Sequence, residues 1–418
     1  MKIIKGNIIQ SISLKDISTI KDGGILLSDD GTVIDVLKSI PADNKIPVID
    51  YGDKLIMQSF ADMHLHAPQF PMLGMGMDLP LLEWLNTYTF KTEARFSNLD
   101  YARNVYSILA KELIDNGTTR VAMFSSLHEE ASIVLMEELE KAGVTGYVGK
   151  VNMDRNSTPE LNETTKESMD NTIRFLNESK KFKNIKPILT PRFTPSCTNE
   201  LMQWLGELSN KENLYIQSHL SENLAEMDWV HALHPDTNRY WESYKKYGLW
   251  KSHTLMAHCV HSDKEERKAL KDYDVYVVHC PDSNVNLSSG VCPVRTYLNE
   301  GVKVVLGSDI AGGAMLPMYR NIQQAIKISK IQGINTKGAD QFLSVNEAFY
   351  LATSAAQEYF GIDNGFAKGH KLHAIVVDDS SFCPSVRDLT LKERFERAVY
   401  MMEKQDIIAV YSEGQKVK

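Results

Sequence analysis

The chain has 418 residues, which is too long for one small domain and suits one large domain with a small addition. Its composition, 43% hydrophobic and 24% charged, is ordinary for a globular protein with a sizeable core. A net charge of −8 argues against the clustered basic surface that nucleic-acid binding needs, and it favours a small molecule as the partner.

The cysteines and the N-terminus indicate the compartment. An odd number of cysteines without a CxxC pair argues against a disulfide framework and against a cysteine zinc site. The five are Cys197, Cys259, Cys280, Cys292 and Cys383. The start of the chain, residues 1–6, lacks the apolar segment of a signal peptide, and no apolar run reaches membrane-spanning length. We therefore expect reduced thiols and a cytoplasmic location.

The first part of the chain, up to about residue 56, is predicted to form short strands. Apolar runs cover residues 2–10, 24–28 and 33–37, and turn residues such as Asp29-Asp30-Gly31 separate them. This pattern predicts a small β-domain.

From about residue 54 onward, short apolar strands alternate with helical patterns. Parallel strands that are buried on both faces have this apolar character. The eight candidate strands cover residues 55–63, 120–124, 146–151, 185–190, 214–219, 254–258, 275–279 and 302–307. Eight strand-then-helix units predict an α/β fold, a (β/α)8 barrel of the TIM type.

The end of the chain returns to β character. Ser344-Val-Asn-Glu347 has the pattern of a capping box and predicts a helix that runs to about Phe360. Apolar runs follow at residues 374–378 and 407–411. We therefore expect both chain ends, 1–57 and 370–418, to form one small β-sandwich domain beside a barrel domain of residues 58–369.

Two histidines end the first predicted barrel strand. In a strand, residues i and i+2 project to the same face, so His64 and His66 can share one metal ion. They lie at the carboxyl end of the strand, where barrels place their active sites. The alternative is a pair of ordinary histidines, and the pair alone leaves both interpretations open.

Three further polar residues follow predicted strands. His219 ends the fifth strand, His258 ends the sixth, and Asp309 follows the eighth. A single histidine at a strand end is usually structural, but this set at corresponding ends predicts a metal site. Nitrogen and oxygen ligands without cysteine suit Zn²⁺ or Fe²⁺, and a catalytic site keeps one position open for water.

Glu222 lies three residues after His219. It is either a glutamate favoured by the dipole of a helix start or a general acid/base beside the metal site, and its position favours the second role.

The segment Thr190-Pro191-Arg192-Phe193 ends the fourth predicted strand. No lysine stands there to bridge two metals, so one metal is expected. Arg192 is a surface arginine or a donor to a substrate oxygen or ring nitrogen, and Phe193 is a core residue or stacks on a planar ring. His279 would be one ligand too many, so it lines the pocket or supports Asp309.

The order of these motifs resembles the deaminase branch of the amidohydrolase superfamily. It runs His64-Leu-His66, His219-Leu-Ser-Glu222, Ala257-His258, His279-Cys-Pro-Asp-Ser-Asn284 and Gly307-Ser-Asp309. Within that branch the chain is similar to the guanine deaminase family. Four stretches carry this similarity: His66-Ala-Pro-Gln69, residues 82–85 with 88–96, residues 190–197, and Asp309-Ile-Ala-Gly-Gly313.

The resemblance implies an aminohydrolase of cyclic amidines that converts guanine to xanthine and ammonia in purine breakdown or salvage, with one Zn²⁺ (or Fe²⁺) per chain and a homodimer. The implied metal ligands are His64, His66, His219 and Asp309. The implied catalytic residues are Glu222, Asp309 and His258, with His258 bonded to the water or substrate and not to the metal. Gln69, Arg192, Phe193 and His279 are the implied substrate contacts.

Two other functions stay open at this point. The first is a deaminase or hydrolase of another ring, such as 8-oxoguanine, a cytosine- or adenosine-type base, or a triazine. The second is a catalytically inactive barrel that serves binding or assembly. Such a chain typically lacks metal ligands, which are all present here.

Overall fold

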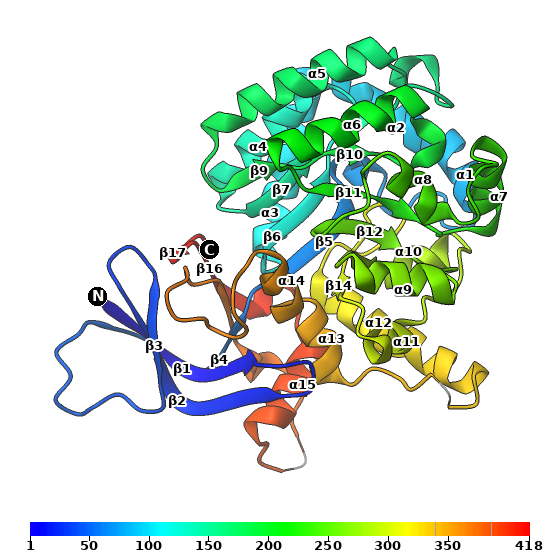
Figure 1. Cartoon of the computed structure of the whole chain (residues 1–418). Coiled ribbons are helices and arrows are strands. Elements are labelled where there is room, and N and C mark those ends of the chain that lie inside the picture. The colour runs from blue at the N-terminus through cyan, green and yellow to red at the C-terminus, as the bar shows by residue number, and fades with distance from the viewer. Residues whose placement is uncertain (339, 386) are drawn as a thin grey trace.

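Both ends of the chain build one seven-stranded sheet in the computed structural model, which describes residues 1–338, 340–385 and 387–418 (Figure 1). The order across the sheet is β17-β16-β15-β4-β1-β2-β3. The strands are β1 (Lys2–Ser11), β2 (Ile17–Leu27), β3 (Val33–Leu37), β4 (Val48–Gln58), β15 (Ala374–Val377), β16 (Ile407–Ser412) and β17 (Gln415–Lys416). The two ends meet where β15 pairs antiparallel with β4, Ala374 opposite Gln58.

The alternation of side chains along these strands gives the sheet two apolar faces. In β15, Ala374 and Val376 join a separate core of the sheet, whereas Ile375 and Val377 join the main core of the protein. Because successive side chains in a strand point to opposite faces, one short apolar run can serve both cores. The sheet is thereby fixed against the rest of the chain.

The middle of the chain forms parallel strands surrounded by helices (Figure 1). One four-stranded sheet contains β5 (Phe60–His66), β6 (Thr118–Phe124), β7 (Thr145–Gly149) and β9 (Ile185–Pro187). A second contains β11 (Ile216–Leu220), β12 (Thr254–His258), β13 (Tyr276–His279) and β14 (Val304–Leu306). A short pair joins β8 (Val151–Asn152) and β10 (Thr190–Pro191). Helices cover these sheets, so the strands are buried on both faces, as their apolar sequences predict.

The helices alternate with these strands along the chain. They are α1 (Leu81–Trp84), α2 (Phe90–Ala94), α3 (Leu99–Asp115), α4 (Glu129–Ala142), α5 (Thr165–Glu178), α6 (Asn199–Glu212), α7 (Leu224–Leu233), α8 (Tyr240–Lys246), α9 (Lys264–Asp272), α10 (Pro281–Asn286), α11 (Val294–Glu300), α12 (Met318–Asn335), α13 (Val345–Leu351), α14 (Ser354–Tyr359) and α15 (Leu391–Met401). A 3₁₀ segment, η1 (Ala67–Met72), and a π-helical turn, η2 (Leu85–Thr89), follow β5. Among the helices of the described residues, none combines the length and apolar character that crossing a bilayer requires.

Three predicted strands are divided in the structure, and one of them, 146–151, is split into β7 and β8. The segment 55–63 is wrong as a single strand, because β4 ends at Gln58 and β5 begins at Phe60, whose N–H donates to Gly117 O (2.9 Å) outside the small sheet. The segment 185–190 is split into β9 and β10. Between them Ile188 donates to Val148 O of β7 and Leu189 donates to Tyr215 O beside β11, so the chain changes neighbours there.

The helix predicted from Ser344 to about Phe360 is two helices. Its start is confirmed, because Ser344 and Glu347 form the capping box of α13. The helix is interrupted between α13 and α14, where the carbonyl of Ala352 accepts from Ala61 N (2.9 Å). A neighbouring strand thus takes a carbonyl that a continuous helix would use.

A buried histidine links the seven-stranded sheet to β6. His373 Nδ1 lies 2.8 Å from Thr119 Oγ1, and its Nε2 lies 3.0 Å from Glu413 Oε1. Burial, with a contribution from Arg120, lowers the pKa of His373 to about 4. The unfolded chain binds this proton near pH 6.5, so folding opposes protonation between these values.

We expect His373 to make the protein less stable as the pH falls through the window from about 6.5 to 4. Its contribution is fully present above pH 6.5, and about 2 kcal/mol of it is lost at pH 5. Urea unfolding at pH 7.5 and pH 5 measures this change. His373→Gln lacks the titrating group and should lose less stability over the same interval; an equal loss in both proteins would contradict the assignment.

Candidate active site

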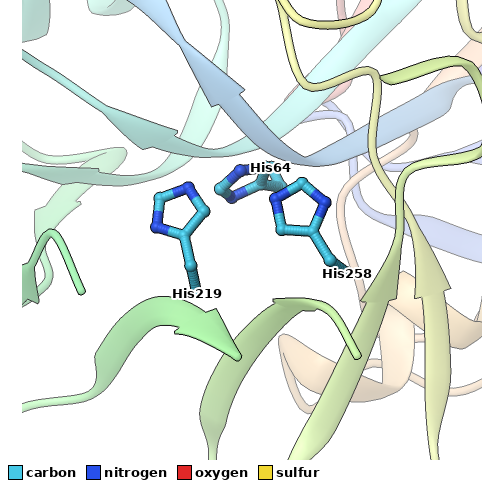
Figure 2. A group of neighbouring side chains, drawn as sticks. All are labelled: His64, His219 and His258. Carbon is cyan, nitrogen blue, oxygen red and sulfur yellow. The ribbon is translucent and has the colours of Figure 1, made fainter. Parts of the chain in front are cut away.

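The polar residues predicted at strand ends lie together at the carboxyl ends of the parallel strands. His64 and His66 belong to β5, His219 to β11 and His258 to β12, and Asp309 follows β14. Figure 2 shows the rings of His64, His219 and His258 turned toward one another, and their ligand atoms lie within 4.8 Å of one another. All are buried. Parallel strands from distant parts of the sequence therefore bring these side chains to one point.

Asp309 and three imidazoles are in close contact. His64 Nε2 lies 3.2 Å and His66 Nε2 lies 3.6 Å from Asp309 Oδ1. His66 Nε2 lies 3.2 Å from His219 Nε2.

The donor atoms fit a divalent metal ion. His219 Nδ1 lies 2.6 Å from the carbonyl oxygen of Arg192, which can only accept, so Nδ1 carries the proton and Nε2 has a free lone pair. His64 Nε2 is buried and has no hydrogen-bond partner among the described residues. An ion that accepts nitrogen and oxygen ligands, such as Zn²⁺ or Fe²⁺, satisfies both observations.

The electrostatics suit a cation as well. Burial lowers the pKa of His64, and it lowers the pKa of His66 and His219 well below the usual value. Neutral imidazoles are the form that binds metals. Burial alone would raise the pKa of Asp309, but the neighbouring imidazoles, led by His64, hold this pKa far below the usual range. The carboxylate is therefore ionised.

His258 bridges the two carboxylates of the site. Its Nε2 lies 3.4 Å from Glu222 Oε2 and 3.8 Å from Asp309 Oδ2, and its Nδ1 lies 2.9 Å from Asn284 Oδ1. Burial opposes protonation of the ring, but Glu222 and Asp309 together raise the pKa of His258. His258 is thus placed to hold a proton between the two acids.

Glu222 follows β11 and is buried. Ser289 Oγ donates to its Oε1 (2.9 Å), and Glu226 Oε2 accepts from the backbone N–H of Glu222 (3.0 Å). Burial raises the pKa of Glu222 against the opposing effect of His258. Burial, together with Glu222, raises the pKa of Glu226 to about 7. A carboxyl group in this environment retains a proton more readily than one in water and can donate it.

Several non-glycine residues at this edge have left-handed backbone. The φ angles are 47° at Ser221, 73° at His258 and 48° at Asp309. Such conformations cost roughly 1–3 kcal/mol each and persist where surrounding contacts hold them. Asp309 is held by a hydrogen bond from its N–H to His64 O (2.8 Å). The backbone turns that aim these side chains are therefore fixed by neighbouring strands.

A second group of polar side chains faces the cluster from η1, α2 and the segment after β10. Gln69 Nε2 donates to Glu93 Oε1 (2.8 Å), and Gln69 Oε1 accepts from Ala311 N (3.0 Å). Arg192 donates to both oxygens of Glu93, at 2.6 and 3.0 Å. All three side chains are buried. Two predicted residues, Gln69 and Arg192, thus meet across an acid that the sequence analysis did not single out.

A cavity lies between this group and the histidine cluster. Leu81, Trp84 and Leu85 cover it from α1 and η2, and Phe193 lines it beside Trp229 (ring centroids 5.9 Å apart). The apolar cover and the polar wall suit a flat heterocycle with polar edges.

Two further buried residues, His279 and Cys280, lie near the site. His279 is buried at the end of β13, is not among the side chains that line the cavity, and has a pKa lowered to about 3 by burial and by His258. Cys280 lies within reach of His64 and Asp309, but burial raises the pKa of its thiol well above the usual value. A protonated thiol is a poor nucleophile.

Three buried acids that form hydrogen bonds to the predicted site residues or to their neighbours were not among the candidates from the sequence. Asp62 accepts from Ser308 N (2.9 Å) and burial raises its pKa to about 7; Glu93 and Glu226 are described above. Asp62 stands two residues before His64, and Glu226 four after Glu222, so spacing offered a weak signal for both. For Glu93, the only signal was its place in the segment 88–96.

Comparisons with known proteins agree on the family. The sequence profile of the amidohydrolase family matches residues 55–417. The guanine deaminase of Dictyostelium discoideum is 38% identical, with 100% of this chain and 98% of that protein covered, and the enzyme of Mus musculus is 38% identical, with 87% and 83% covered. The crystal structure of guanine deaminase from C. acetobutylicum with bound guanine has 45% identity and a TM-score of 0.96 over 100% of both chains. The chain therefore belongs to the amidohydrolase family and, within it, to the guanine deaminases.

Proposed function

We propose that this protein hydrolyses guanine to xanthine and ammonia with one bound divalent metal ion. The observation that supports this proposal most directly is the cavity. One side of it is formed by the buried histidines and Asp309, and the other side by the polar side chains of Gln69 and Arg192. The similarity to a guanine deaminase solved with guanine bound, which extends over both whole chains, supports the same substrate.

We propose that the parallel strands form one closed eight-stranded barrel. The two four-stranded sheets meet at both of their edges. On one side Leu189 bridges to Ile216 of β11, and on the other Asp309 N donates to His64 O (2.8 Å) while Ile310 O accepts from His66 N (2.9 Å). Closure removes free strand edges and gathers all carboxyl ends at one mouth.

We propose that residues 1–57 and 370–418 form a separate small β-sandwich beside a barrel of residues 58–369. The seven-stranded sheet curls so that the turn at Gly31 meets the turn at Gly414; a Cβ on Gly31 would lie 2.5 Å from Gly414 Cα. Only glycine permits this approach, and the enclosed face holds the separate apolar core.

His64, His66, His219 and Asp309 would hold the metal, with Zn²⁺ or Fe²⁺ as its identity. A bound metal ion lowers the pKa of water toward about 7 and so supplies a nucleophile at neutral pH. His258 also lies close to His64 and His219, but its contacts with Glu222 and Asp309 favour a role in holding a proton.

The chain's acids would move the protons. Ionised Asp309 takes a proton from the attacking water as the oxygen bonds to C2 of guanine. Glu222, whose pKa is raised by burial, donates a proton to the neighbouring ring nitrogen N3, so negative charge does not build up there. Asp309 then passes its proton to the amino group, the C2–N bond breaks and ammonia leaves. The C2 hydroxyl returns a proton to Glu222, which leaves the C2 carbonyl of xanthine and restores both acids. His258, between both acids, stabilises each proton transfer.

The remaining side chains would orient the base. Arg192 donates to O6, Gln69 donates to a second polar edge atom, and Phe193 contacts the ring face. A wall of donors rejects adenine, because the donors would be left unpaired. We also propose a homodimer in the cytoplasm, where the five cysteines, which form no disulfide among the described residues, stay reduced.

Purified protein loaded with zinc should convert guanine to xanthine with a higher kcat/KM than any other base. The panel is guanine, adenine, cytosine, 8-oxoguanine and an aminated triazine, with ammonia release and xanthine formation as readouts. If the protein turns over another ring faster than guanine, that ring is the preferred substrate and the proposal of guanine is wrong. An inert, metal-free protein that zinc does not activate would point to a binding function.

Glu222→Gln should retain metal and structure but lose activity about 10²–10⁴-fold, because the amide cannot deliver a proton. The measurements are kcat for guanine and metal content by elemental analysis. Near-normal turnover in the variant would remove Glu222 from the proton path.

His219→Ala should lose metal, because the remaining ligands must bind it without one imidazole. We expect an affinity loss of at least about tenfold, since even partners outside the ligand set contribute 10–100-fold. His231→Ala, on the exposed side of α7, is the matched control and should keep its metal. Equal metal content in the two variants would exclude His219 as a ligand.

A further inference from the structure

We propose that Glu93 is a positioning residue that makes the polar wall of the cavity donate hydrogen bonds only, and that this selects a 6-oxopurine over a 6-aminopurine. The inference rests on the proposed deamination and concerns its specificity. Glu93 is carried by α2, outside the strand ends that hold the metal site.

Glu93 is an acceptor surrounded by donors. It is 1% exposed and accepts three hydrogen bonds, from Gln69 Nε2 at 2.8 Å and from Arg192 at 2.6 and 3.0 Å. A carboxylate that accepts from a guanidinium has no hydrogen to offer in return. Both partners must therefore turn N–H groups toward it.

The contacts of Gln69 fix which end of its amide is which. Ala311 N can only donate, so the oxygen Gln69 Oε1 must face it (3.0 Å). Glu93 can only accept, so the nitrogen Gln69 Nε2 must face it (2.8 Å). A flipped amide would lose both hydrogen bonds. The nitrogen keeps its second hydrogen for a ligand, whereas the oxygen is turned toward Ala311 N and already accepts from it.

Arg192 is held on the same side. Glu93 binds two of its terminal nitrogens, and the ring of Phe90 lies 5.4 Å from the centre of the guanidinium. Phe90 and Glu93 are three residues apart and therefore share one face of α2. Arg192 is thus fixed before any ligand arrives, and its remaining N–H groups are donors.

The wall consequently offers hydrogens and no acceptor. Guanine presents acceptors at O6 and N7, whereas a 6-amino group is a donor. A donor placed against donors leaves buried groups unpaired, which a hydrogen-bonding site rejects strongly. 2,6-Diaminopurine is a discriminating probe, because it keeps the reacting 2-amino group and replaces O6 by a second amino group.

The test compares kcat and KM of the zinc-loaded protein for guanine and 2,6-diaminopurine. Wild type should prefer guanine by at least about 100-fold in kcat/KM. In Glu93→Gln the amide at position 93 can donate a hydrogen bond, so the side-chain amide of Gln69 is free to flip. We expect a KM for guanine raised about tenfold, a nearly unchanged kcat, and a preference for guanine reduced about tenfold.

Two further variants separate this role from a general loss of structure. Glu93→Asp keeps an acceptor-only group and should keep the preference while KM rises. Glu347→Gln alters a similarly buried pair, Arg295 with Glu347 at 2.8 Å, outside the cavity, and should change neither substrate's kinetics selectively.

The outcomes distinguish the two proposals. Absence of guanine turnover in wild type overturns the proposed function. Turnover of guanine with an equal rate on 2,6-diaminopurine in wild type, or with an unchanged preference in Glu93→Gln, overturns the role of Glu93 alone. If Glu93→Gln does not fold, the wild-type ratio and Glu93→Asp still decide, because loss of the preference in Glu93→Asp contradicts an acceptor-only requirement.

Discussion

The placement of one buried carboxylate, Asp309, among ring nitrogens is the constraint on which the rest of the structure depends. A charge in a protein interior is stable only when it is paired and hydrogen-bonded. Here the pairing groups, His64 and His66, come from β5, the first of the parallel strands, and the backbone of Asp309 bonds to His64 O. The first and last parallel strands therefore have to meet, and they must meet in one register.

The histidine cluster and the polar wall of the cavity are one connected unit. The carbonyl of Arg192 orients His219 through Nδ1, while the side chain of Arg192 is bound by Glu93. Gln69 bonds to Glu93 on one side and to Ala311 N, two residues after Asp309, on the other. A ligand that shifts any member of this ring of contacts therefore also acts on the histidine cluster. Under the proposed function, these short hydrogen bonds would couple binding of the base to the geometry of the metal site.

The acids of the site divide their roles through their surroundings. Asp309 is ionised because imidazoles surround it, whereas Glu222 has a raised pKa because apolar burial dominates there. Two carboxyl groups that His258 joins can therefore accept and donate protons at the same pH. The same principle keeps the nearby thiol of Cys280 protonated and inactive.

The sequence by itself determined the elements that local patterns encode. Alternating apolar runs predicted the parallel strands, and the spacing of His64 with His66 predicted a shared ligand face, because strand geometry is local. The tertiary structure decided what depends on distant segments. It split residues 55–63 between two sheets, brought Leu189 beside β11, left His279 outside the cavity and set Glu93 between Gln69 and Arg192. The two contacts of Glu93, for example, join residues that are 24 and 99 positions apart in the sequence. A hydrogen bond across such a separation leaves no periodic pattern in the sequence.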